Sequence, residues 1–257
     1  MVRRFLAGSV AGYVARTALE ALRSDARLSR TNFRGRAVSL AGGPALAVGA
    51  TAGGVVASRS GRQAAATAVA GLGSGAVGLY DDIVGSRPEH AAKGFGGHLA
   101  ALREGRVTSG LVKIVGVGAS GVVAAALLPR RSRLDLVVNA GLIAGAANLA
   151  NLLDLRPGRA LKAGLIAGTA VGDAASVGAA GALIDADLRE EIMLGDAGAN
   201  ALGALIGTAF AARGSRVGRI VALAGIVALT AASEKVSFTK VIERTPGLRE
   251  LDALGRR

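Results

Sequence analysis

Two adjacent acids, Asp81 and Asp82, follow an apolar stretch of the sequence and are candidates for metal and phosphate chemistry. Neighbouring carboxylates repel each other, so both remain charged only beside a cation or a basic partner. Mg²⁺ meets that need in many sites, because it commonly binds one or two carboxylates together with substrate phosphates. The alternative is a solvated helix end that binds no ligand.

A second polar motif is formed by Asn148, Asn151 and Asp154, which lie three residues apart. This spacing places the three side chains on one stripe of a helix. They end an otherwise apolar segment, so the stripe indicates a polar cleft at one membrane face. Asparagines that hydrogen-bond to a neighbouring helix are the alternative.

A third motif is an acid between glycines, Gly195-Asp196-Ala197-Gly198, at the predicted start of a helix. A helix N-terminus favours an anion, and glycines let a phosphate approach the backbone. Asp196 would then hold the metal. An aspartate that only caps the helix is the alternative.

The fourth feature is Lys93, which stands among glycines in the loop 86–108. A lysine in such a loop suits phosphate contact, although lipid headgroups would explain it equally well. All four features fall on one predicted face of the membrane. Acids in a transporter or channel would instead be expected near the middle of the membrane.

These motifs must be positioned by an all-α, polytopic membrane bundle of about eight to nine short spans. Long stretches with few charges approach the roughly 20 residues that a spanning helix needs, and their Ala and Gly suit close helix packing. Gly172-Asp173 is a turn signal that can split one run of about 25 apolar residues into two short helices. The expected spans are 5–22, 40–57, 63–80, 109–128, 134–153, 160–172, 174–185, 198–212 and 218–234.

The charge of the chain is strongly basic, with 31 Lys and Arg against 18 Asp and Glu. The arginines cluster between apolar runs, which indicates anchoring at a membrane surface rather than nucleic acid binding. With the split at Gly172, placing the loop 23–39 in the cytoplasm puts more Lys and Arg on that side. The chain has no cysteine and two histidines, which disfavours disulfides and a zinc site of the usual ligands.

The whole chain, residues 1–257, is expected to form a single integral membrane domain. A short amphipathic helix is predicted at about 246–254, with Thr245 as its N-cap and Gly255 as its stop. It would lie on the membrane surface or on the protein itself, or it would dock a partner.

In this order, the motifs resemble those of the polyprenyl-phosphate N-acetylhexosamine-1-phosphate transferases. The family includes the bacterial phospho-N-acetylmuramoyl-pentapeptide transferase. The resemblance covers about residues 30–210 and includes a Gly-Gly that ends the first cytoplasmic loop, here Gly42-Gly43. The Asp-Asp pair, the Lys-Gly loop start, the Asn-x-x-Asn-Leu-x-Asp run and the Gly-Asp-x-Gly run follow it.

The resemblance implies a Mg²⁺-dependent phosphoglycosyl transferase, multi-pass in the plasma membrane, with its active face in the cytoplasm. A polyprenyl phosphate would attack the β-phosphate of a UDP-sugar, and UMP would leave, in cell-envelope glycan synthesis. Asp196 and Asp82 would bind Mg²⁺. Asp81 and Asp82 would contact the metal or accept a proton from the lipid phosphate.

The same resemblance implies the residues that bind the substrates. Asn148, Asn151 and Asp154 would shape the nucleotide pocket, and Lys93 would contact phosphate. The best-known relatives are dimers, so a homodimer is among the assemblies to expect.

The chain also departs from the family pattern. The run Leu155-Arg156-Pro157-Gly158 stands where the family has Gly-Leu-Asp-Gly, so the second acid is missing, and the histidine-rich loop near the C-terminus is absent. An alternative therefore stays open, in which a transferase-like protein binds polyprenyl phosphate or organises partner enzymes without catalysis.

Overall fold

The structure is a computed structural model of the chain, and it describes residues 1–85, 101–103, 105 and 107–256. This part of the chain is mostly helical. A small antiparallel sheet pairs β1 (Ser29–Thr31) with β2 (Ala37–Ser39). The helices are α1 (Val2–Leu22), α2 (Gly42–Ala57), α3 (Gly61–Ala68), α4 (Ser74–Val84), α6 (Ser109–Leu127), α7 (Arg133–Leu153), α8 (Arg159–Val171), α9 (Ala174–Leu188), α10 (Gly195–Arg213), α11 (Arg216–Ser233), α12 (Phe238–Arg244) and α13 (Leu248–Ala253).

Every apolar segment expected from the sequence is helical. The segment 63–80 consists of α3 and α4, which join through a π-helical turn at Val69–Gly73. The run 160–185 forms two helices, because Gly172 ends α8 in the left-handed conformation at φ +70°. Glycine adopts that conformation without steric cost, so the chain reverses there and α9 packs against α8.

Three helices, α6, α7 and α11, are long and apolar enough to cross a membrane. The expectation of eight to nine spans is therefore met in part. Helix α2 is apolar but has 16 residues, and α8 has 13. At 1.5 Å per residue, α8 extends roughly 20 Å, which is less than the hydrocarbon thickness of a bilayer.

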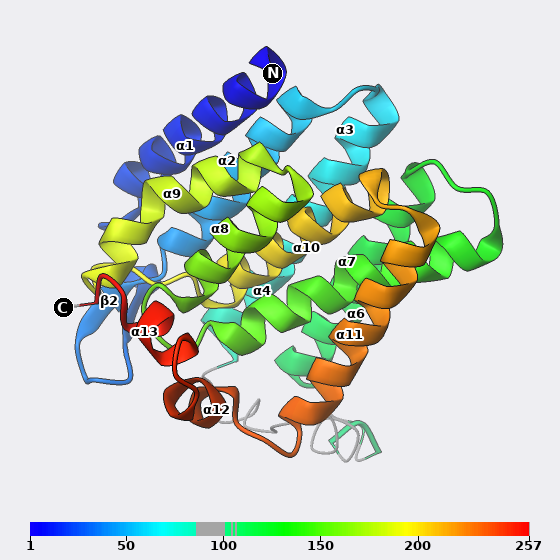
Figure 1. Cartoon of the computed structure of the whole chain (residues 1–257). Coiled ribbons are helices and arrows are strands. Elements are labelled where there is room, and N and C mark those ends of the chain that lie inside the picture. The colour runs from blue at the N-terminus through cyan, green and yellow to red at the C-terminus, as the bar shows by residue number, and fades with distance from the viewer. Residues whose placement is uncertain (86–100, 104, 106, 257) are drawn as a thin grey trace.

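Glycine and alanine let the helices pack at backbone distance. A Cβ atom on Gly49 of α2 would lie 2.6 Å from the carbonyl oxygen of Ala11 in α1. A Cβ atom on Gly203 of α10 would overlap the carbonyl oxygen of Ala146 in α7. Helix α10 runs through the middle of the bundle, where it packs on α2, α4 and α7 (Figure 1).

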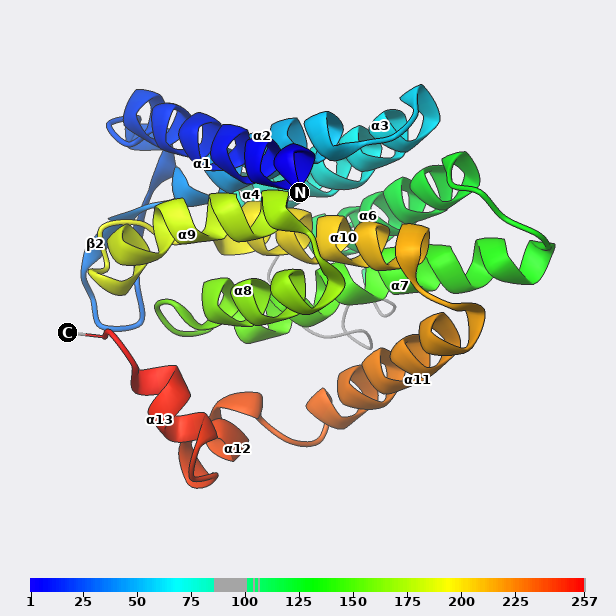
Figure 2. The ribbon, with the colours of Figure 1, turned by 45° about the horizontal axis from the view of Figure 1, so that its top comes forward.

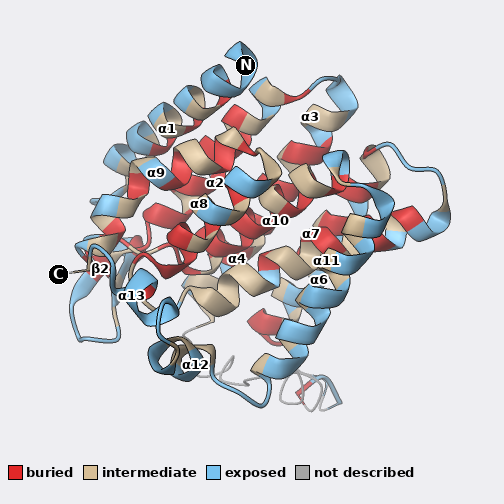
Figure 3. Ribbon diagram, viewed as in Figure 1, coloured by how far each residue is buried: buried red, intermediate tan, exposed pale blue. Residues whose placement is uncertain are grey.

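Burial decreases from α10 toward the C-terminal helices. Figure 3 shows buried residues concentrated along α10 and its neighbours. Helix α11 has no buried residue in the described structure and packs mainly on α7. Figure 2 shows α11, α12 and α13 on one side of the other helices.

The C-terminal helix docks on the protein itself. Arg159 Nε of α8 lies 2.8 Å from Asp252 Oδ1 of α13, and both side chains are buried. Lys162 Nζ donates to the backbone carbonyls of Leu251 and Asp252. The predicted N-cap is wrong by two residues, because Thr245 ends α12 and Gly247 caps α13.

Candidate functional site

Two of the predicted acids converge on a lysine that comes from a third helix. Lys113 Nζ, near the start of α6, lies 2.7 Å from Asp81 Oδ2 at the end of α4. The same nitrogen lies 2.6 Å from Asp196 Oδ2 at the start of α10. The three side chains are between 11% and 23% exposed, so solvent weakens these ion pairs only partly.

Asp82 has a different environment from its neighbour Asp81. Its Oδ1 accepts the backbone N–H of Asp196 at 2.9 Å, and its Oδ2 accepts that of Ala197, also at 2.9 Å. The anion expected at the N-terminus of α10 is therefore supplied by Asp82 itself. Each oxygen keeps a further lone pair, but the observed contacts make Asp82 a cap for α10.

The glycines of these motifs allow the helices to touch. A Cβ atom on Gly78 of α4 would overlap the Asp196 carbonyl oxygen. A Cβ atom on Gly198 would lie 2.8 Å from Cα of Gly43, the second glycine of the predicted loop end. Gly195 has φ +57°, and a Cβ atom there would lie 2.8 Å from Asp82 Oδ1. The chain itself thus fills the space beside Gly195 and Gly198, where a phosphate was expected to approach.

The segment before α10 is held by the hairpin that precedes α2. The backbone N–H of Ser39 donates to the Glu191 carbonyl at 3.1 Å, and that of Met193 donates to the Ser39 carbonyl at 2.9 Å. Arg30 of β1 donates to the Asp82 carbonyl at 2.6 Å. These bonds fix the start of α10 relative to the end of α4, and with it the position of Asp196.

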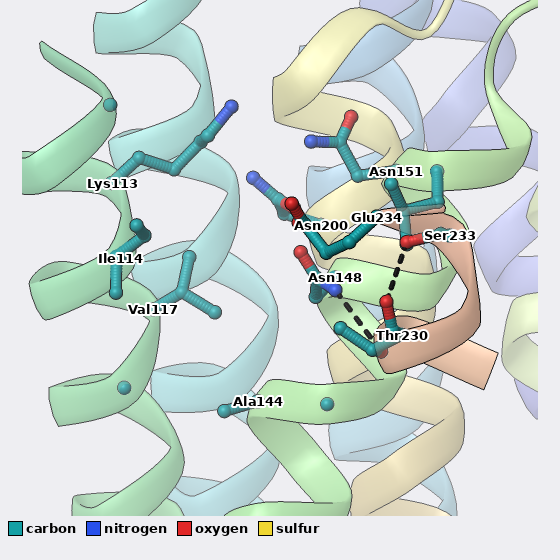
Figure 4. A pocket seen from close by; sticks show the side chains of 14 residues that line it. Lys113, Ile114, Val117, Ala144, Asn148, Asn151, Asn200, Thr230, Ser233 and Glu234 are labelled. Atoms are coloured by element: carbon teal, nitrogen blue, oxygen red, sulfur yellow. Dashed lines mark hydrogen bonds between the residues drawn. The ribbon is translucent and has the colours of Figure 1, made fainter. Parts of the chain in front are cut away.

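A cavity of about 470 Å³ opens beside Lys113 and is bounded by α6, α7, α10 and the end of α11. Asn148 and Asn151 line it, and Asn148 Nδ2 donates to Thr230 Oγ1 at 3.4 Å. Figure 4 shows the asparagines across the cavity from Lys113, with Ile114 and Val117 on the Lys113 side. We name this space the asparagine cavity.

Asp154, the last member of the same motif, lines a different cavity of about 220 Å³. This second cavity, the hairpin cavity, also includes Phe33, Arg156, Asp187 and Glu190. The Arg156 guanidinium lies 4.4 Å from the centre of the Phe33 ring, a cation–π contact. The structure therefore does not bring Asn148 and Asn151 into one pocket with Asp154.

Burial raises the pKa of the Asp154 carboxyl well above its usual value, and the charges of Asp187, Asp82 and Asp196 raise it further. A hydrogen bond from the Gly195 backbone opposes this effect. Asp154 therefore lies close enough to Asp82 and to Asp196, at the start of α10, to interact with them electrostatically.

Lys93, which was predicted to contact phosphate, lies outside the described residues. Among the described side chains, no group of three or more His, Cys, Asp and Glu is arranged to hold a metal. Asp81 and Asp196 nevertheless point at one ammonium group, so their oxygens face a common position that a cation occupies.

Lys113 was not among the site residues predicted from the sequence. A signal was present, because Lys113 is the one charged residue within the 19-residue helix α6, and ionisable residues in apolar spans are functional candidates. Phe33, Asp187 and Glu190 carried no such signal. They meet Asp154 through tertiary contacts between segments far apart in the sequence.

Comparisons of the sequence with models of protein families and with curated proteins find no match.

Proposed function

We propose that this protein is a membrane transferase that moves a sugar-1-phosphate from a UDP-sugar to a polyprenyl phosphate and releases UMP. An oxygen of the lipid phosphate attacks the phosphorus that bears the sugar. The bond from that phosphorus to the bridging oxygen breaks, and UMP leaves with the electron pair. The product would serve cell-envelope glycan synthesis.

The observation that carries the proposal is the convergence of Asp81 and Asp196 on Lys113 beside the asparagine cavity. Phosphoryl transfer depends mainly on positioning and on the neutralisation of charge. Lys113 supplies a cation at the rim of a space large enough for a substrate headgroup. A lipid phosphate is largely ionised near neutral pH, so a strong base is not required.

The donor nucleoside would bind in the hairpin cavity. Arg156 over Phe33 offers a flat cationic and aromatic surface for a base. Asp187 accepts the Gly158 N–H through Oδ2 and has a second oxygen to accept an N–H or hydroxyl group, whereas both oxygens of Glu190 already accept from Asn32 and Arg34. Asp154 lines this cavity and is close enough to Asp196 for their charges to interact, so donor phosphates bound here would extend toward Asp196.

Mg²⁺ is part of the proposal. Asp81 and Asp196 would hold it in place of the Lys113 ammonium, which lies at the position that both carboxylates face, and the substrate phosphates would complete the ligand set. When bound, Mg²⁺ would neutralise charge on the phosphates. Asp82 would act by fixing the start of α10, since both of its oxygens already accept backbone N–H groups.

The proposed arrangement in the membrane rests on the hydropathy and charge pattern of the sequence. We infer eight to nine short helices in the membrane of the cell, with the ends that carry Asp81, Asp154 and Asp196 at the cytoplasmic face. The three long apolar helices support an embedded protein. A homodimer is compatible with this arrangement.

The test is UMP release by the purified protein in detergent with undecaprenyl phosphate, Mg²⁺ and a panel of UDP-sugars. We expect release with one donor, loss of release on chelation, and loss in Asp196→Asn. Asp185→Asn is the matched control, because Asp185 is 68% exposed and pairs only with Arg189 in the described structure. Equal release by Asp196→Asn and wild type would refute the proposed role of this site.

A non-catalytic lipid-binding protein is the second candidate. It is favoured by the salt bridges themselves, because Lys113 already neutralises the two acids without a metal. This candidate predicts lipid phosphate binding that does not depend on Mg²⁺, together with no UMP release from any donor.

A further inference from the structure

Asn200 carries a polar group that the folded chain leaves without a partner. The residue is 2% exposed, and its Nδ2 is among the buried side-chain atoms with no hydrogen-bond partner in the described structure. Nearly all buried polar groups in native proteins are hydrogen-bonded, because an unpaired one destabilises the folded state. A buried, unpaired donor that also lines a cavity is therefore a candidate partner for a bound acceptor.

The fold directs this amide into the asparagine cavity. Asn200 follows Asp196 by four residues, so the two side chains lie on one face of α10. Gly203, one turn further on, packs directly on the backbone of Ala146 and Ala147 and brings α10 against α7. Figure 4 shows Asn200 beside Asn148 and Asn151 at the polar end of the cavity.

The walls of the cavity define the kind of ligand. Ile114 and Val117 of α6 and Ala144 of α7 are apolar, and both helices are long and apolar enough to cross a membrane. The polar end instead presents amides, hydroxyls, the Lys113 ammonium and the Glu234 carboxylate. An amphiphile with acceptor oxygens at its head and a hydrocarbon chain matches both parts.

We propose that Asn200 Nδ2 donates a hydrogen bond to a phosphate oxygen of the acceptor lipid, so that Asn200 selects a phosphorylated polyprenol over the free alcohol. The inference deepens the proposed function and rests on it for the identity of the acceptor. Phosphate oxygens accept hydrogen bonds and suit a donor with no other partner. Lys113 adds charge but is already shared by two carboxylates, so a neutral donor contributes selectivity that Lys113 alone does not.

The test compares Asn200→Leu with wild type in the absence of any nucleotide donor. Leucine has a similar size and removes the amide. We expect the affinity for farnesyl phosphate to fall about tenfold, the value of one hydrogen bond, with no change for farnesol. The Tm of the ligand-free variant should equal or exceed that of wild type, because no hydrogen bond of the free protein is lost.

Thr51→Val is the matched control. Thr51 Oγ1 is also buried without a partner, but Thr51 does not line the asparagine cavity. This change should leave farnesyl phosphate affinity unchanged. Asn200→Asp is a second variant of the same shape, and its carboxylate should weaken farnesyl phosphate binding further by repulsion.

Several results would overturn the inference. Unchanged farnesyl phosphate affinity in Asn200→Leu, or an equal loss for farnesol, would exclude the hydrogen bond to phosphate. A lower Tm of the ligand-free Asn200→Leu protein would assign the amide a structural role. Displacement of farnesyl phosphate by an equal concentration of inorganic phosphate would show that the site binds phosphate without the lipid chain, and would exclude a lipid acceptor. Absence of UMP release would refute the transfer reaction but leave this binding result intact.

Discussion

Replacing Asp82 by asparagine separates a structural from a catalytic role for the Asp-Asp pair. Both carboxylate oxygens of Asp82 accept backbone N–H groups from the start of α10, each at 2.9 Å. Asparagine keeps one oxygen and turns an NH₂ group toward the second N–H. One charge-assisted hydrogen bond is lost, a donor faces a donor, and the favourable interaction of the charge with the helix dipole disappears.

The magnitude follows from these losses. A hydrogen bond to a charged group contributes about 1.5–3 kcal/mol, and a charge at a helix N-terminus adds roughly 0.3–1 kcal/mol. Asp82→Asn should therefore lower the free energy of unfolding by about 2–4 kcal/mol. For a chain of this size, the corresponding fall in Tm is roughly 5–15 °C.

The assay is thermal unfolding in detergent beside UMP release, with Asp81→Asn as the comparison. Asp81 accepts no backbone N–H of α10 in the described structure, and its loss leaves Lys113 paired one-to-one with Asp196. We expect Asp81→Asn to lose activity while it keeps most of its stability, and Asp82→Asn to lose both. An Asp82→Asn protein with wild-type Tm and no activity would refute the assignment of Asp82 as a helix cap.

Four further changes test the remaining contacts. Lys113→Met leaves two acids facing each other, so added Mg²⁺ should raise the Tm of the variant more than that of wild type. Asp252→Asn leaves the buried Arg159 and the partly buried Arg256 without an acidic partner, and it should destabilise the C-terminal helices by about 3–5 kcal/mol and speed their cleavage by trypsin. Gly43→Ala places a methyl group on the Leu194 carbonyl oxygen and should cost about 1–3 kcal/mol, measured by thermal unfolding. Because burial raises the pKa of the Asp154 carboxyl, this group lowers the free energy of unfolding as pH rises above its unfolded-state pKa of about 3.9. Asp154→Asn removes the group, so it should raise the free energy of unfolding at pH 7 and make it depend less on pH.

Matched controls exist for these changes. Gly225→Ala lies in α11, where a Cβ atom meets nothing within 4 Å, and it should not destabilise the protein. An equal loss of stability in Gly43→Ala and Gly225→Ala would contradict the packing argument. A C-terminal segment that resists trypsin equally in Asp252→Asn and wild type would contradict the role of the buried ion pair.

The local signals of the sequence were sufficient for the helices. Apolar runs bounded by arginine, glycine and capping residues predicted most of the helical segments, because such signals act within a few residues, whereas a break at Gly172 was one of two possibilities that the sequence left open. Asp81, Asp82 and Asp196 were also recognisable as candidate site residues. Acids at the ends of apolar helices are costly unless a partner or a ligand stabilises them.

The distribution of side chains between cavities could not be predicted. The stripe of Asn148, Asn151 and Asp154 suggested one pocket, but α7 ends at Leu153, and Asp154 turns toward the hairpin cavity while the asparagines stay on the helix. Likewise, nothing near Asp82 in the sequence indicates that its partners are the amides of Asp196 and Ala197.

By itself, the sequence determined which segments are helical, to within a few residues at their ends, and which acids are out of place in an apolar chain, because helix formation and hydropathy depend on neighbouring residues. Tertiary structure alone decided that Lys113 lies between Asp81 and Asp196, that Asp82 caps α10, and that Asn200 is buried without a partner. These facts depend on contacts between α4, α6 and α10, whose geometry is set by where glycines let the backbones meet.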